Sequence, residues 1–139
     1  MIGVSGLLVL IVSGVLKNFI FNGLPRPSAF YEGVFDLYYV PGVELHSMNS
    51  FPSGHTMAAF ACYLTLCFVL NKKWTSYLLF AVAILVGYSR MYLSQHFLID
   101  ITVGAMLGVI LGAISIRLIN SWNWSKLDDS LISLLKKNA

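Results

Sequence analysis

Charged side chains are scarce in this sequence. Lysine, arginine, aspartate and glutamate make up 11% of its 139 residues, whereas 58% are hydrophobic. In soluble domains about a quarter of all residues are charged, so the low charged fraction here argues against a soluble domain and indicates a membrane protein. The net charge of +3 is too small for a nucleic-acid-binding surface, which needs a concentrated basic face. At this length we expect one domain.

Metal-ligating and disulfide-forming residues are equally sparse. The two cysteines, Cys62 and Cys67, lie five apart inside one apolar stretch and have no matching pair elsewhere. We therefore expect both to be small buried hydrophobic residues. Outside the motif described below, Glu32, Asp36 and Glu44 are spread along a loop, and the remaining acidic residues, Asp128 and Asp129, lie in the C-terminal tail. The sequence thus predicts no metal site and no cofactor.

Four apolar segments dominate the chain: Ile2 to Phe21, Thr56 to Leu70, Trp74 to Tyr88 and Phe97 to Ile119. A helix needs about 20 residues to cross the hydrocarbon core, and the second and third segments reach this length with their flanks, as 53–71 and 74–92. Only helices or closed barrels span lipid, and these segments lack the alternation of a barrel. We expect an all-α fold, a multi-pass transmembrane helix bundle whose membrane-embedded domain covers residues 1–120.

The basic residues predict which helix ends face the cytoplasm. Four passes place Met1, the turn at 71–73 and the C-terminal tail on one side. That side carries most of the basic residues: Lys72, Lys73, Arg117, Lys126, Lys136 and Lys137. Because cytoplasmic loops are enriched in lysine and arginine, we expect this side to be cytoplasmic. The loop 22–52 then lies on the periplasmic or extracellular face. We expect the membrane to be a bacterial inner membrane.

The two ends of the chain give weaker signals. The first apolar segment lacks a basic start and an Ala-x-Ala cleavage site, so we expect a retained helix and not a signal peptide. In the tail, 121–139, Ser125 and Asp128 resemble a capping box, and leucines recur on one helical face. This pattern is typical of a helix at the cytoplasmic membrane interface, but a flexible tail explains it equally well.

The strongest chemical signal is Ser89-Arg90, followed by five residues, His96, three residues and Asp100. On a helix, His96 and Asp100 are one turn apart on the same face. The carboxylate can then fix the tautomer of the imidazole and leave its other nitrogen as a nucleophile or base. Arg90 supplies a planar fork of donors suited to phosphate. The alternative is a structural His–Asp pair that joins two helices.

A second cluster, Pro52-Ser53-Gly54-His55, opens the second membrane helix on the same predicted side as His96. Ser53 can cap the helix, and the backbone N–H groups near Ser53 and Gly54 can bind an anion. Gly54 lets a bulky phosphate approach the backbone, and His55 adds a second imidazole. A capped helix start with an incidental histidine is the plainer interpretation.

A third cluster places Lys17 at the outer end of the first helix, followed by Arg26-Pro27. It supplies two cations on the same face as the other clusters. Taken alone, Lys17 is better explained as an interface residue whose amine reaches toward water.

In this order, the three clusters resemble the three signature motifs of the type 2 phosphatidic acid phosphatase family, which shares its site with the vanadium haloperoxidases. The second and third match the family's spacing in full. The first departs from it, because eight residues separate Lys17 from Arg26 where the usual pattern has six. Membrane members usually have six transmembrane helices, and the four found here resemble the last four. A fragment, a late start site or a shortened variant would each explain this difference.

The resemblance implies a metal-independent phosphatase acting on a phosphorylated membrane lipid in the bilayer. His96 would attack phosphorus and form a phosphohistidine, with Asp100 orienting it. His55 would protonate the leaving lipid oxygen and then activate water. The groups that hold the phosphoryl oxygens would be Lys17, Arg26, Ser53, Gly54 and Arg90. The substrate would be a phosphomonoester or a diphosphate, and the resemblance does not say which lipid carries it.

Two other functions stay open at this point. One is a haloperoxidase that binds vanadate in the same pocket, although those enzymes are soluble. The other is a non-catalytic or truncated lipid-binding membrane protein, against which the intact His55, His96 and Asp100 argue.

Two further patterns concern structure more than chemistry. The aromatic residues of the loop 28–51 could admit a lipid from the bilayer or form an interfacial belt. Gly104, Gly108 and Gly112 extend the row of Asp100 at intervals of four, which predicts close packing against a neighbouring helix.

Overall fold

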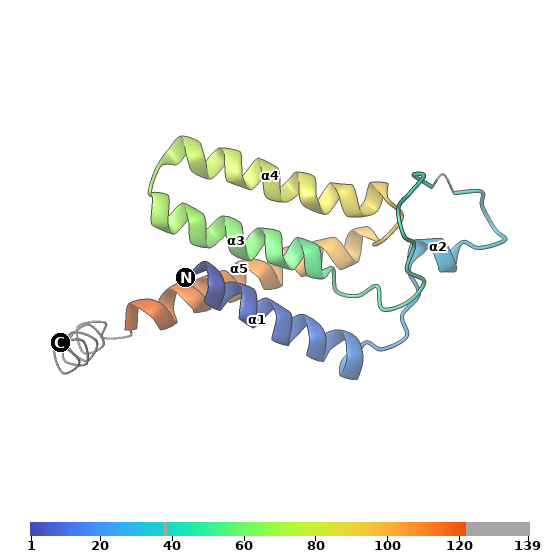
Figure 1. Ribbon diagram of the computed structural model, residues 1–139, viewed down its shortest axis with the longest axis horizontal. Coiled ribbons are helices and arrows are strands. Elements are labelled where there is room, and N and C mark those ends of the chain that lie inside the picture. Colours follow the sequence, from blue (N-terminus) through green and yellow to red (C-terminus); the bar gives the residue numbers. More distant parts are fainter. Residues whose placement is uncertain (38, 122–139) are drawn as a thin grey trace, which may run out of the picture.

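The computed structural model describes residues 1–37 and 39–121. Within these residues helices are the only regular secondary structure (Figure 1). Helix α1 (Ile2–Val15) continues into a short π-helical segment, η1 (Leu16–Ile20). The remaining helices are α2 (Pro27–Phe30), α3 (Gly54–Leu70), α4 (Lys73–Tyr92) and α5 (Leu98–Ser121). The all-α prediction is confirmed. The predicted tail helix falls in 122–139, outside the described residues.

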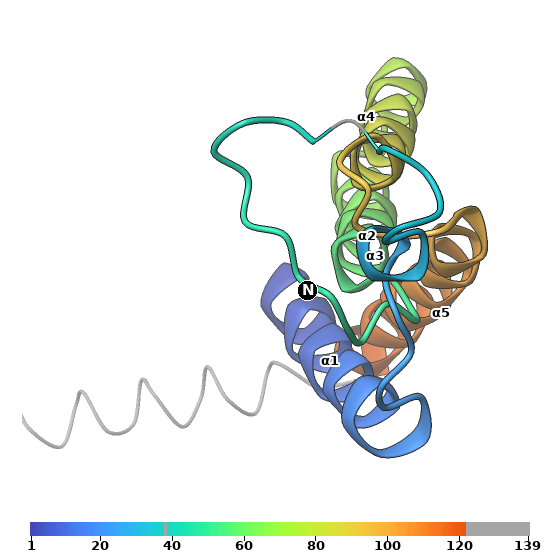
Figure 2. The same cartoon turned by 90° about the vertical axis from the view of Figure 1, so that its right-hand side faces the viewer.

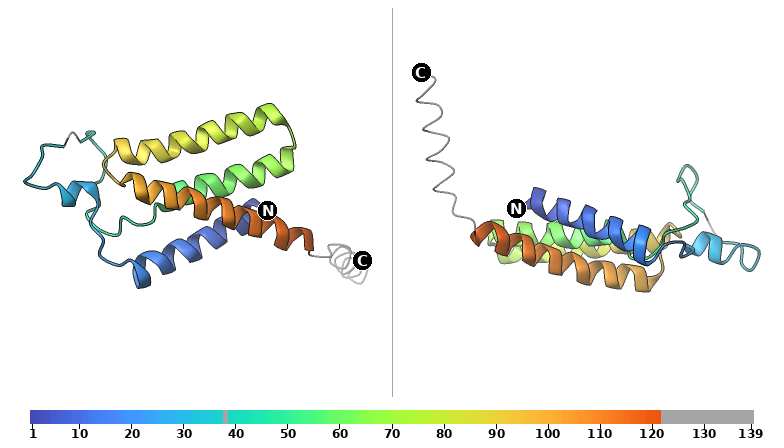
Figure 3. Two further views of the ribbon diagram at one scale, coloured as in Figure 1. Left: turned by 180° about the vertical axis from the view of Figure 1, so that it is seen from behind. Right: turned by 90° about the horizontal axis from the view of Figure 1, so that it is seen from below.

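Helices α3 and α5 form the centre of the bundle. Their mutual contact is the most extensive in the described structure, and α1 and α4 pack on either side of α3 without touching each other. Figure 2 shows this arrangement from the end, with α1 and α4 at opposite edges. Helices α1 and α4 finish, and α3 and α5 begin, at the end of the bundle that carries α2 (Figures 1 and 3). We call this the α2 end.

Three of the helical segments are long and apolar enough to cross a membrane: Ile2–Ile20, Lys73–Tyr92 and Leu98–Ser121. The fourth apolar helix, α3, has 17 residues, at the lower limit for a span. Large apolar side chains cover the outer faces of the bundle; Leu10, for example, is 73% exposed and Leu98 is 65% exposed. Such faces suit contact with lipid chains, and the protein is an integral membrane protein.

The boundaries of α3 follow from its capping residues. The Ser53 hydroxyl accepts a hydrogen bond from the Thr56 N–H (3.4 Å), as expected for an N-cap. At the other end Asn71 adopts a left-handed conformation (φ 47°), and its N–H donates to the Cys67 carbonyl (3.0 Å). This short turn reverses the chain into α4, so that α3 and α4 run antiparallel (Figure 1).

The glycine row of α5 lies directly against the backbone of α3. A Cβ atom at Gly108 would lie 2.4 Å from the Met57 carbonyl oxygen, and one at Gly104 would lie 2.7 Å from the Ser53 carbonyl oxygen. Such distances are far below van der Waals contact, so only glycine allows the two helices to approach this closely. The predicted packing role of the row is confirmed.

The prediction for the cysteines was wrong. Cys62 and Cys67 are free and partly exposed instead of buried. In a membrane protein an apolar side chain is compatible with lipid as well as with the helix interface. Hydrophobicity therefore did not indicate which of these positions face the interior of the bundle.

We predict that Gly108→Ala destabilises the bundle, because the new methyl group would collide with backbone atoms of α3 that cannot move independently. The expected loss is about 1–3 kcal/mol of unfolding free energy, typical of overpacking. Thermal unfolding of the purified protein in detergent measures it. Gly3→Ala is the matched control, since nothing lies within 4 Å of the added Cβ. Equal melting temperatures for the two variants would contradict the packing role of Gly108.

Candidate active site

His96 and Asp100 meet as their spacing predicts. His96 lies in the connection between α4 and α5, two residues before α5 begins, and Asp100 lies in the first turn of α5. The Nδ1 atom of His96 lies 3.3 Å from Oδ2 of Asp100, and both side chains are buried. A carboxylate at this nitrogen favours the tautomer with the proton on Nδ1. The lone pair is then on Nε2, the nitrogen that could act as a nucleophile.

The Asp100 carboxylate is held by more than the histidine. Its Oδ2 atom also accepts hydrogen bonds from the Phe97 N–H (2.9 Å) and from the Ser50 hydroxyl. The backbone carbonyl of Asp100 accepts from the Ser53 N–H (3.0 Å). The start of α5 is therefore tied both to the loop before α3 and to the N-cap of α3.

Burial and charge act together on His96. Removal of the imidazole from water lowers the pKa of His96, and the positive charges of Arg26 and Lys17 lower it further. The hydrogen bond to Asp100 opposes these effects and only partly offsets them. His96 is therefore neutral, and able to act as a nucleophile, at a lower pH than an ordinary histidine.

Arg26 is buried and held at two points. Its Nε atom donates to the Met48 carbonyl (2.9 Å), and its Nη1 atom donates to the side-chain oxygen of Gln95. Gln95 in turn donates to the Glu44 carbonyl (3.1 Å) and is itself buried. Gln95, which directly precedes His96, thus connects the guanidinium of Arg26 to the long loop.

Lys17 reaches the same end of the bundle through a local change of helix type. It lies in η1, where the Phe21 N–H donates to the Leu16 carbonyl (2.7 Å), five residues back. A π turn of this kind rotates side chains relative to a regular α-helix and is frequent at functional sites. Lys17 is half-buried and interacts electrostatically with Arg26, Arg90 and Asp100.

The start of α3 presents the second cluster. Ser53 is fully buried, and its hydroxyl accepts from Thr56. A Cβ atom at Gly54 would lie 2.9 Å from the Ser13 hydroxyl, so α1 approaches α3 at this point. His55 is exposed and interacts electrostatically with Arg90, His96, Lys17 and Arg26.

Arg90 lies in the last turn of α4 and contributes to this site through its backbone carbonyl and its side chain. Its carbonyl accepts from the N–H groups of Gln95 (3.0 Å) and His96 (3.3 Å), which fixes the turn that carries His96. Its Nε atom is buried, and it is the only such side-chain nitrogen or oxygen without a hydrogen-bond partner among residues 1–37 and 39–121. A buried unpaired donor is costly, and an anion bound beside it would supply the missing acceptor.

The structure therefore gathers all the predicted site residues at the α2 end: Lys17, Arg26, Ser53, Gly54, His55, Arg90, His96 and Asp100. The structure does not add His46 to this group: His46 is exposed, and its carbonyl accepts a hydrogen bond from the Ser28 hydroxyl. Phe30 of α2 makes an edge-to-face contact with Phe97, the residue before α5, with ring centroids 5.6 Å apart.

Sequence reasoning missed two residues that support the site, Ser50 and Gln95. Both are buried, and their partners Asp100 and Arg26 are far away in sequence. The only available signal was local: each is an uncharged polar residue beside a motif, three before Ser53 and one before His96.

Comparisons with known proteins show to which family the chain belongs. The sequence profile of the PAP2 superfamily matches residues 1–124. The chain belongs to the PAP2 superfamily. Phosphatidylglycerophosphatase B of Bacillus subtilis is 38% identical over 74 residues, which cover 47% of this chain and 36% of the relative. An undecaprenyl-diphosphatase of Sulfolobus acidocaldarius is 27% identical, and the match covers 92% of this chain and 59% of that protein.

A solved structure extends the likeness to three dimensions. The crystal structure of the first transmembrane PAP2-type phosphatidylglycerolphosphate phosphatase from Bacillus subtilis superposes with a TM-score of 0.69 at 27% identity. The match covers 88% of this chain and 59% of that one. The chain thus spans less than two thirds of each of these three PAP2 relatives.

We predict that the imidazole of His96 titrates below the ordinary histidine value of about 6.5, because burial and two nearby cations disfavour its protonated form. Asp100→Asn should lower the pKa of His96 further, since it removes the charge that favours protonation. NMR of protein with isotope-labelled histidine measures both values. A pKa of His96 above about 6.5 would contradict the prediction.

Proposed function

We propose that this PAP2 protein hydrolyses a phosphate ester or diphosphate of a membrane lipid through a phosphohistidine on His96. The observation that carries the proposal is the buried His96–Asp100 pair beside three basic side chains. A purely structural ion pair would not need Lys17, Arg26 and Arg90 within electrostatic range of one another, since like charges repel.

The first step would transfer the phosphoryl group to the protein. The lone pair on Nε2 of His96 attacks phosphorus, an N–P bond forms, and the bond from phosphorus to the lipid oxygen breaks. His55 gives its proton to that oxygen, so the lipid leaves as a neutral alcohol. If the substrate is a diphosphate, the leaving group is a lipid phosphate instead. Asp100 stabilises the positive charge that the attacking imidazole acquires.

The second step would release inorganic phosphate. His55, now neutral, takes a proton from water as the water oxygen attacks phosphorus. The N–P bond breaks, and its electron pair returns to His96. In both steps the charge on the phosphoryl oxygens is stabilised by the three basic side chains and by donors at the start of α3. Among the described residues no group of three or more His, Cys, Asp and Glu side chains could hold a metal ion. The proposed steps assign every role to the protein's own side chains and backbone.

The position of the site supports a lipid substrate. The proposed catalytic residues lie at one end of helices long and apolar enough to span a bilayer, so the phosphate of a membrane lipid is within reach at the membrane edge. The opposite end carries Lys72, Lys73 and Arg117. By the tendency of basic residues to stay in the cytoplasm, we propose that the α2 end is periplasmic or extracellular.

The phosphohistidine is tested by trapping it on variants with one histidine changed. The chain has three histidines, so His55→Ala, His96→Ala and His46→Ala cover every candidate. With p-nitrophenyl phosphate in EDTA, His55→Ala should accumulate acid-labile phosphate on His96, because this leaving group needs no acid but water still needs a base. With a lipid phosphate, whose leaving group does need the acid, the turnover of His55→Ala should fall by about 10²–10⁴-fold.

His96→Ala should lose both labelling and turnover, whereas His46→Ala is the matched control and should behave as wild type. Phosphate on another residue, or activity that persists without His96, would refute the mechanism. A strict requirement for added Mg²⁺ would refute the proposed metal-independent site.

The orientation is tested with single cysteines in a background that carries Cys62→Ala and Cys67→Ala. A cysteine at exposed Glu44 should react with a membrane-impermeant maleimide in intact cells. One at exposed Lys72 should react only after the membrane is opened. The reverse pattern would place the site on the cytoplasmic face.

A further inference from the structure

A groove of about 580 Å³ runs between α1 and α3 and ends at the candidate site. Its walls are mostly apolar or lack side chains, and two basic residues lie at its head. The residues that matter for the argument are Gly6, Leu10 and Gly14 of α1, Ala58 of α3, and Lys17 and His55 at the head.

The groove matches the depth of a lipid chain in one leaflet. Gly6 and Lys17 are 11 residues apart, so the stripe on α1 is about 16 Å long at the helical rise of 1.5 Å per residue. Half of a bilayer's hydrocarbon core is about 15 Å. An apolar groove of this length, with two basic residues at its head, suits an anionic head group attached to one hydrocarbon chain.

The chemistry of the site points to the same groove. On the proposed function, on which this inference rests, His55 protonates the oxygen that leaves phosphorus and must lie within hydrogen-bond reach of it. His55 is exposed and lines the head of the groove. The lipid attached to that oxygen therefore begins at the groove's head.

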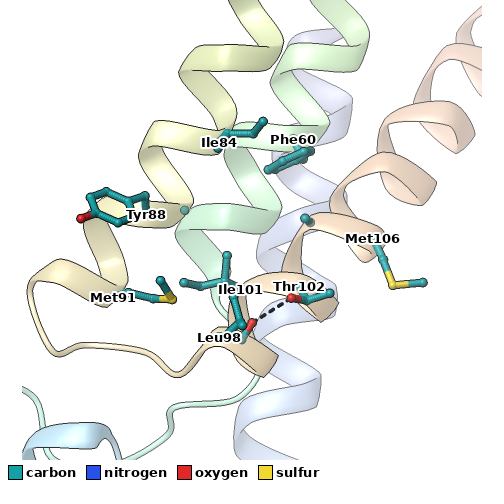
Figure 4. A pocket seen from close by; sticks show the side chains of 10 residues that line it. Phe60, Ile84, Tyr88, Met91, Leu98, Ile101, Thr102 and Met106 are labelled. Carbon is teal, nitrogen blue, oxygen red and sulfur yellow. Dashed lines mark hydrogen bonds between the residues drawn. The ribbon is translucent and has the colours of Figure 1, made fainter.

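A second apolar groove, of about 430 Å³, lies between α4 and α5 and lacks this connection (Figure 4). None of the proposed catalytic residues lines it. The figure shows aromatic, aliphatic and methionine side chains around it, and the hydroxyl of Thr102 is engaged with the Leu98 carbonyl (2.9 Å). This groove offers no charged group to a phosphate.

We propose that the groove between α1 and α3 binds the hydrocarbon chain of the substrate lipid. The chain extends from the leaving oxygen at His55, past Gly14 and Leu10, to Gly6. The position of a residue along α1 therefore determines which part of the bound hydrocarbon chain its side chain would contact.

The glycines allow a direct test. Nothing lies within 4 Å of a Cβ atom built at Gly6 or Gly14, so the side chain of a leucine at either position would begin in the open space of the groove. Leucine also favours the helix over glycine. Gly3→Leu is the matched control, because Gly3 has the same open surroundings on the same helix but does not line the groove.

The measurement is kcat/KM for single-chain n-alkyl phosphates of increasing chain length, each relative to p-nitrophenyl phosphate with the same variant. Gly14→Leu should lower the long-chain ratio by about tenfold, the effect of roughly two methylenes losing their apolar contact. Gly6→Leu should lower the ratio only for the longest chains. Gly3→Leu, and Ala105→Leu in the α4–α5 groove, should keep the wild-type dependence on chain length.

Other outcomes are distinguishable. If a helix of another molecule occupied the groove, Gly14→Leu would change activity equally for every substrate, or change the oligomeric mass, and the proposal would be wrong. Loss of chain-length dependence in Ala105→Leu but not in Gly14→Leu would move the chain to the other groove. A wild-type protein that forms no phosphohistidine would overturn the proposed function itself, and this inference with it.

Discussion

A carboxylate removed from water needs hydrogen-bond donors, and the Asp100 side chain at the membrane edge imposes this need on everything around it. One of its oxygens accepts from the Ser50 hydroxyl, the Phe97 N–H and the imidazole of His96. Because these donors come from the loop before α3 and from the connection before α5, the hydrogen bonds of one carboxylate fix the path of the loop. The same contacts hold the imidazole in one orientation.

The helices can support this network only because α3 and α5 pack closely. Gly104 lets the start of α5 lie against the Ser53 carbonyl, and the Ser53 N–H donates to the Asp100 carbonyl at the same level. His55 follows Ser53 by two residues, and His96 precedes Asp100 by four. The contact between the two helices therefore sets the separation of the two histidines. A larger residue in the glycine row would change that separation as well as stability.

The electrostatics of the α2 end favour an anion. Lys17, Arg26 and Arg90 are three cations facing one buried carboxylate, which leaves a surplus of two positive charges. A phosphate monoester carries about −1.5 to −2 at neutral pH, close to what this surplus needs. Such a group, if bound there, would relieve the mutual repulsion among the cations, and it would offer an acceptor to the unpaired Nε of Arg90. The apolar grooves have the opposite character, so one molecule with a charged head and an apolar chain matches both.

The sequence by itself determined the features that depend on short spacings within one helix. These include the helix ends at Ser53 and Asn71, the pairing of His96 with Asp100, and the glycine row of α5, because 3.6 residues per turn fixes which side chains share a face. Family motifs then indicated the chemistry of the remaining site residues.

Tertiary structure alone decided how distant segments meet. Ser50 reaches Asp100 and Gln95 reaches Arg26 across 50 and 69 residues, through a long loop with no periodic pattern. Lys17 depends on a π turn that propensities do not reveal, and the groove between α1 and α3 exists only once both helices are placed. Apolar residues are acceptable both to lipid and to a helix interface, so composition could not show which face of each helix is turned inward.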